Sequence, residues 1–125
     1  MKRYGINIKE FEPMSRHSTW RCGGVADLFF QPRRLEELSS FIEENTDSVE
    51  IVWLGLGSNL LVRDGGFHGV IVSTTKALKE IIWSENNKSL YVQSGVSCAK
   101  VAREAASKNR KGLEFLIGIP GTIGG

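Results

Sequence analysis

The chain has 125 residues, 41% of them hydrophobic and 24% charged, and its 16 basic and 14 acidic residues give a formal net charge of +2. These values are typical of a soluble globular protein that forms one domain, or two small subdomains with a shared core. The net charge is too small to favour a nucleic acid or a membrane surface as partner. The sequence has no apolar stretch of membrane-spanning length and no apolar signal region after its first residues, so we expect a cytoplasmic protein.

The two cysteines, Cys22 and Cys98, lie far apart and lack the spacing of metal ligands. We therefore expect no metal site and no disulfide. In a reducing cytoplasm both would be free thiols that pack as small hydrophobic residues.

A strand, a helix and a second strand are expected after a polar and mixed segment over residues 1–19. The first strand covers residues 26–31 and is closed by Pro32. In the helix that follows, the apolar residues recur on one face, and the glutamates lie mostly elsewhere, as on a solvated face. These apolar residues are Leu35, Leu38, Phe41 and Ile42. Turn-forming residues from Asn45 end the helix, and residues 50–54 return to the sheet.

A glycine-rich loop, Gly55-Leu56-Gly57-Ser58-Asn59, follows that second strand. Residues 60–62 predict another buried strand, so we expect the loop to be a tight strand-to-strand connection. Successive N–H groups in such a loop can form a concave nest for phosphate oxygens, with Ser58 and Asn59 at its rim. Leu60 stands where the Rossmann fingerprint requires a third glycine, so that motif is absent. Taken alone, Gly-x-Gly favours an ordinary turn.

Further strands are expected downstream of this loop. A stretch rich in turn residues at 63–69 precedes a strand at 70–72. Residues 73–82 are ambiguous, although Leu78, Ile81 and Ile82 suit one or two turns of helix. Residues 90–93 read as another strand after a polar turn.

A second helix is expected from the N-cap Ser97 to Lys108, with small apolar residues on the face that packs against a sheet. Gly112 is the expected C′ residue. Basic residues follow the helix, and complementing the helix dipole is a commoner reason for them than a phosphate site. These are Lys108, Arg110 and Lys111.

The final stretch, residues 112–125, alternates glycine with apolar residues. Such a segment favours an extended backbone that lies against a flat apolar surface, and it is too apolar for a flexible linker. A natural domain seldom ends on such a loop, so we expect that the chain is truncated. Its uncovered apolar residues would then promote self-association or require a partner chain.

Three sequence blocks, at residues 18–28, 54–67 and 112–125, together carry a family resemblance. In this order and spacing they resemble the UDP-N-acetylenolpyruvoylglucosamine reductase family, flavoenzymes of bacterial peptidoglycan synthesis. Cys22 and Val25 depart from the family's commoner residues, and Leu56 stands where a small or polar residue is frequent. Neither the glycines nor the Ser58-Asn59 pair is affected.

The resemblance implies an α+β fold, the FAD-binding domain of the vanillyl-alcohol-oxidase (PCMH) type. Residues 1–73 and 74–125 would form two small subdomains, the second incomplete, with FAD between them. Gly55, Gly57, Ser58 and Asn59 would cradle the FAD pyrophosphate, and Leu60 belongs to the same cofactor site. The flavin ring and the neighbouring phosphate region would be lined by Ile119, Pro120, Gly121, Thr122, Gly124 and Gly125.

In this family NADPH reduces FAD, which then reduces the enolpyruvyl group of UDP-N-acetylglucosamine enolpyruvate. The catalytic residues and the substrate domain lie downstream of residue 125, so we expect the chain alone to be inactive. Two alternatives remain open: a non-catalytic flavin- or nucleotide-binding module with a separate partner, and an inactive gene fragment. A sugar-oxidising flavoenzyme would often tether FAD through His or Cys, and neither His17 nor His68 lies in a block that suggests this.

Overall fold

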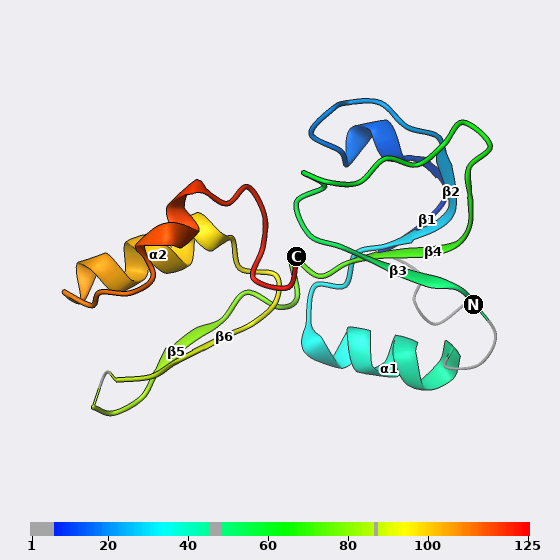
Figure 1. Ribbon diagram of the computed structural model, residues 1–125. Helices are drawn as coiled ribbons and strands as arrows, with labels where there is room; N and C mark the ends of the chain where they lie inside the picture. The colour runs from blue at the N-terminus through cyan, green and yellow to red at the C-terminus, as the bar shows by residue number, and fades with distance from the viewer. Residues whose placement is uncertain (1–6, 46–48, 87) are drawn as a thin grey trace.

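The computed structural model describes residues 7–45, 49–86 and 88–125, and Figure 1 shows two α+β parts, each with its own sheet. The first part holds a four-stranded sheet in the order β1-β2-β4-β3. Strands β2, β4 and β3 run parallel, and β1 pairs antiparallel with β2 at one edge. The elements are β1 (Ile8–Pro13), η1 (Met14–Arg16), β2 (Val25–Phe30), α1 (Leu35–Asn45), β3 (Ile51–Leu54) and β4 (Phe67–Ser73).

Helix α1 covers one face of this sheet, and η1 with its neighbouring loops lies over the other (Figure 1). On the α1 side, Leu38 and Phe41 pack against Phe30, whose ring centroid is 4.6 Å from that of Phe41. Met14 and Phe29 belong to the cluster on the opposite side. Because both faces are covered, β4 is buried from Gly69 to Ser73, as expected for a strand in a parallel sheet.

The second part consists of a two-stranded antiparallel hairpin, a helix and a short 3₁₀ segment. Strands β5 (Ile81–Trp83) and β6 (Leu90–Val92) precede α2 (Cys98–Ser107) and η2 (Glu114–Gly118). The predicted N-cap is confirmed, since the hydroxyl of Ser97 accepts a hydrogen bond from the Lys100 N–H at 3.3 Å.

The end of α2 corrects one prediction. Asn109, at φ +54°, takes the left-handed position, and its N–H donates to the Ala106 carbonyl while that of Arg110 donates to the Ala105 carbonyl. These two bonds form a Schellman motif, so the C′ residue is Asn109 and not Gly112. Gly112 has φ +103° but lies farther along the following loop.

Residues 60–62 are not the strand that their apolar run predicted. Instead, the carbonyl of Val62 accepts a hydrogen bond from the N–H of Gly24, and a Cβ atom on Gly24 would overlap the carbonyl oxygen of Arg63. The side chain of Val62 is buried in the core, whereas Leu61 is exposed. A loop packed on glycines therefore takes the place of a sheet ladder.

Other differences concern short segments. Strand β1 arises within the polar and mixed segment, for which no element was predicted, and the ambiguous stretch contributes Ile81 and Ile82 to β5. Cys98 is buried, as predicted, but Cys22 is exposed, and both are free thiols. None of the described helices is long and apolar enough to span a membrane, and the described residues contain no cluster of metal-ligating side chains.

Candidate ligand-binding site

The glycine-rich loop over residues 55–59 leaves the carboxyl end of β3. Strands β2 and β4 run parallel to β3, so all three end at the same edge of the sheet. Ligands of open parallel sheets bind in the crevice outside the carboxyl ends of the strands. This sheet edge is therefore the first place to look for a site.

The structure brings the two predicted glycine-rich segments together at this edge. The hydroxyl of Ser58 donates a hydrogen bond to the carbonyl of Pro120. Gly55 lies directly against Thr122, because a Cβ atom built on Gly55 would be 2.6 Å from the Thr122 Oγ1 atom. Gly121 faces Ser58 with more room, its Cβ position being 3.8 Å from the hydroxyl oxygen. Segments more than sixty residues apart thus form one surface.

The loop presents five consecutive N–H groups, from Leu56 to Leu60, that donate no hydrogen bond to any described residue. On the facing segment the N–H groups of Gly121 and Thr122 also lack a described acceptor. Backbone N–H groups that are free and clustered in a glycine-rich turn form a typical anion-binding nest. These N–H groups are therefore the candidate donors to the phosphate oxygens of a nucleotide.

Two of the predicted glycines have a packing role. Gly57 has φ +69°, and a Cβ atom there would overlap the carbonyl oxygen of His17. The carbonyl of Gly57 in turn accepts a hydrogen bond of 2.9 Å from the Thr19 N–H. A Cβ atom on Gly124 would lie 2.7 Å from the Ser94 Cβ atom. Both glycines permit a close approach of two backbones within the protein.

The remaining predicted residues differ in exposure. Asn59 and Gly125 are exposed, whereas the side chain of Leu60 is half-buried and packs against the core, so only its backbone can serve a ligand. Two cavities flank the meeting point. One, of about 340 Å³, is lined by Leu56 and by residues 117–121. The other, of about 400 Å³, is lined by Gly55, Thr122, Gly124 and Gly125 among others.

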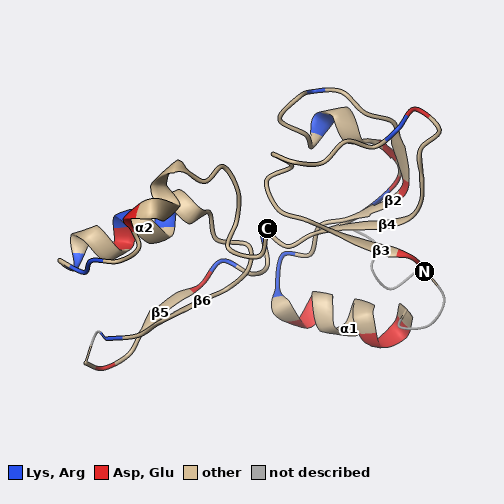
Figure 2. Cartoon of the chain, viewed as in Figure 1, with Lys and Arg blue, Asp and Glu red and all other residues tan. Residues whose placement is uncertain are grey.

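Apolar side chains surround the nest. Leu56, Ile117 and Ile119 are 51%, 56% and 45% exposed, respectively, and Ile123 is also exposed. Figure 2 shows that neither loop carries a charged side chain, so attraction for an anion would come from the N–H dipoles. An uncharged nest beside an apolar surface suits a ligand that combines phosphate with an aromatic ring.

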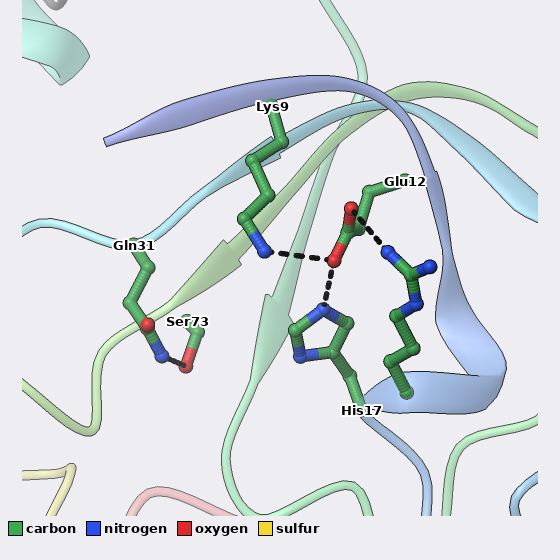
Figure 3. Close-up of polar contacts among 6 residues, drawn as sticks. Lys9, Glu12, His17, Gln31 and Ser73 are labelled. Carbon is green, nitrogen blue, oxygen red and sulfur yellow. Dashed lines mark hydrogen bonds and ion pairs between the residues drawn. The ribbon is translucent and has the colours of Figure 1, made fainter. Parts of the chain in front are cut away.

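A cluster around Glu12 borders the same region and was not predicted from the sequence. The Glu12 carboxylate is 6% exposed, and one of its oxygens lies 2.9 Å from the Lys9 Nζ and 2.8 Å from the His17 Nε2 (Figure 3). Arg16 is 3.8 Å from the other oxygen. His17 lines a polar cavity of about 270 Å³ that also includes Gly55 and Ser73.

Burial alone would raise the pKa of the Glu12 carboxyl, but hydrogen bonds and charge from Lys9 and His17 outweigh it, and the pKa lies below its ordinary value of 4.5. Glu12 is therefore a carboxylate, which only accepts hydrogen bonds, so the His17 Nε2 carries the hydrogen between them. The cluster gives no periodic or motif signal in the sequence, because its partners come from β1, η1 and the loop after η1.

Comparison with known proteins agrees with this geometry. The chain is 44% identical to UDP-N-acetylenolpyruvoylglucosamine reductase of Methylococcus capsulatus over 93% of its length and 38% of the relative's. It is 43% identical to the Nitrosomonas eutropha enzyme over 94% of its length and 36% of that relative's. The predicted resemblance is confirmed, and the chain spans well under half of the curated relatives it matches.

Solved structures confirm the predicted fold. The reductase of Thermus caldophilus has a TM-score of 0.66 and 28% identity, with 91% of this chain and 39% of that chain covered. An alkyldihydroxyacetonephosphate synthase shares the fold at a TM-score of 0.58 and 18% identity, over 83% of this chain and 23% of its own. The fold is thus α+β, of the vanillyl-alcohol-oxidase (PCMH) type.

The family model described as an FAD binding domain matches residues 26–125, which include both glycine-rich segments and the strands that carry them. The chain therefore belongs to the FAD-binding-domain family.

Proposed function

We propose that this chain is the amino-terminal, FAD-binding part of an NADPH-dependent UDP-N-acetylenolpyruvoylglucosamine reductase in the bacterial cytoplasm. Residues 1–73 and 74–125 would form its two subdomains, with the flavin bound between them. The observation that carries the proposal is the junction of the two glycine-rich segments, where free N–H groups meet exposed apolar side chains.

Each part of the nest has a separate task in this proposal. The N–H groups of residues 56–60 hold the negative charge of the pyrophosphate, and Ser58 keeps the facing segment in place through the Pro120 carbonyl. The flavin ring and the neighbouring phosphate region would be lined by Ile119, Pro120, Gly121, Thr122, Gly124 and Gly125, which would exclude water from the ring. Bound FAD would supply the hydride chemistry, and the chain supplies binding and orientation.

The complete reaction needs more than this chain in our proposal. The matched reductases are more than twice as long as the matched region. We place the NADPH and UDP-sugar contacts, and the catalytic groups, in that additional length. The reaction, reduction of UDP-N-acetylglucosamine enolpyruvate to UDP-N-acetylmuramate, therefore remains a proposal for a longer protein that contains this chain.

Gly121 offers the sharpest test of the nest. No positive φ is imposed there, and a Cβ atom has room, so Gly121→Leu should leave the fold intact while its side chain fills the space beside Ser58. Gly65→Leu is the matched control, because nothing lies within 4 Å of its Cβ position. Gly57 serves this purpose less well, since its replacement would disturb packing against His17.

The measurement is FAD affinity by quenching of flavin fluorescence on titration with the chain. We expect Gly121→Leu to weaken binding at least about tenfold, the equivalent of roughly 1.4 kcal/mol, and Gly65→Leu to bind as the parent chain does. Equal affinities for the two variants would refute the proposed location of the cofactor. A well-folded parent chain that binds no FAD would refute flavin binding by this part alone.

A further inference from the structure

His17 links the buried Glu12 to the nest through two different parts of the same residue. Its ring nitrogen contacts the Glu12 carboxylate, and its main chain lies directly under Gly57. The backbone from 17 to 19 also supports the loop through the hydrogen bond from the Thr19 N–H to the Gly57 carbonyl. One residue thus contacts both the buried carboxylate and the loop that forms the nest.

The ring is held on two sides. One side is the Glu12 bond, and the other is the ring of Phe29, stacked at a centroid distance of 4.1 Å and an interplanar angle of 22°. Glu12 is itself fixed by its place near the end of β1, and Lys9 donates a hydrogen bond to the same carboxylate oxygen. Replacing a buried polar pair by an apolar pair of the same shape often costs little net stability, so the contribution we expect from this hydrogen bond is to the local geometry.

From these contacts we infer that Glu12 and His17 are positioning residues for the nest: their bond fixes the backbone of residues 17–19, and through it the N–H groups around Gly57. This inference rests on the proposed function, because the nest is assigned there to the FAD pyrophosphate. Neither residue belongs to the predicted cofactor contacts. Their effect on the ligand is indirect, through the loop.

The charged groups around Glu12 and His17 provide a control variant for the positioning test. Lys9 on β1 and Arg16 on η1 face Glu12, while β2 presents the uncharged Phe29 to the His17 ring. Lys9→Met removes one cationic partner of Glu12 and leaves the His17 bond in place. It therefore separates a general loss of charge pairing from a loss of positioning.

Two His17 variants separate the ring from its hydrogen bond. His17→Phe preserves a ring against Phe29 but cannot donate to Glu12, whereas His17→Gln retains an N–H donor without the ring. The readout that needs no ligand is hydrogen exchange at the Thr19 amide, with the Val72 amide of buried β4 as internal reference. We expect Thr19 to exchange about tenfold faster in His17→Phe and in Glu12→Leu, which removes the acceptor, with Val72 unchanged, and His17→Gln and Lys9→Met to stay near the parent.

FAD affinity provides the second readout and should fall with Thr19 protection, by a similar factor, in the same two variants. Parental Thr19 exchange in His17→Phe would overturn the inference, as would equal acceleration of Thr19 and Val72, which indicates global destabilisation. The two proposals fail separately. Gly121→Leu should lose FAD with normal Thr19 exchange, and a parent chain that binds no FAD would refute flavin binding by this part alone while Thr19 exchange still decides the role of the pair.

Discussion

Replacement of Gly57 by alanine is expected to destabilise the whole first part of the chain. Gly57 has φ +69°, so any L-residue there adopts a left-handed conformation at a cost of about 1–2 kcal/mol. The added Cβ atom would also overlap the carbonyl oxygen of His17 and lie 2.9 Å from its carbonyl carbon. Because these obstacles are backbone atoms, one of the two loops must move, at a further cost of about 1–3 kcal/mol.

The expected total is about 2–5 kcal/mol, a large part of the 5–15 kcal/mol by which typical domains are stable. Urea unfolding followed by circular dichroism would measure it, with two other glycines as graded controls. Gly65→Ala should be near neutral because nothing lies within 4 Å of its Cβ position. The loss of stability in Gly66→Ala should lie between those of the other two variants. Its φ of +85° is unfavourable for alanine, but its Cβ position is 2.9 Å from the Val25 carbonyl oxygen, a milder contact than the overlap at Gly57. If Gly57→Ala and Gly65→Ala unfold at the same urea concentration, the predicted conflict between a Gly57 side chain and the His17 backbone is refuted.

Four further outcomes are expected. Glu12 stabilises the fold above pH 4.5, the ordinary pKa of its carboxyl, and this contribution is lost as pH falls through its lowered folded pKa. The difference in free energy of unfolding between the parent chain and Glu12→Gln, measured with urea, should therefore shrink below pH 4.5. A difference that stays constant with pH would contradict this prediction. Ser97→Ala should lower the free energy of unfolding by about 1 kcal/mol, and Ser97→Gly by less, because the cap to Lys100 is lost. Asn109→Ala should cost about 1 kcal/mol at φ +54°, whereas Asn109→Gly should not destabilise. Phe30→Ala should cost about 3–5 kcal/mol, since Phe30 is 1% exposed against Phe41; a loss under 1 kcal/mol in the same assay would contradict the assigned core.

The elements with the clearest periodicity were predicted well. Helix α1 buries Leu38 and Phe41 as expected, although Leu35 at its start is 48% exposed. Strand β3 has the predicted bounds apart from Glu50, and β4 begins earlier than its apolar run, at Phe67. In these segments local spacing and tertiary burial favour the same structure, so the sequence alone is sufficient.

The errors occur where a tertiary partner decides the backbone. Strand β1 has a polar sequence and exists because its ladder with β2 satisfies one edge of the sheet. Residues 60–62 have a strand-like sequence, but Gly24 provides their hydrogen-bond partner, which leaves no ladder to join. Neither the pairing of β1 with β2 nor the hydrogen bond from Gly24 to Val62 can be predicted from the local sequence pattern.

The same distinction applies to the candidate site. The motifs identified the two loops, and the family resemblance assigned them to one cofactor, but only the structure shows that Ser58 bonds to Pro120 and that Gly55 lies against Thr122. His17 lies outside both predicted sets of cofactor residues. Its role follows from a contact between its carbonyl and Gly57, and backbone contacts of this kind carry no residue-type signal.

The absence of charged side chains from residues 51–62 and 115–125 constrains how a flavin could be held. Without lysine or arginine in these segments, phosphate affinity must come from N–H dipoles, whose direction depends on backbone geometry rather than on side-chain identity. Selection on such a nest falls on the residues that shape the backbone, which here are glycines and the packing groups beneath them. Outside these segments, Glu12 contacts Arg16 and His17, and Arg16 also lines the polar cavity that includes Gly55. A substitution that tilts the loop should therefore weaken cofactor binding more than the loss of the exposed Asn59 side chain at its rim.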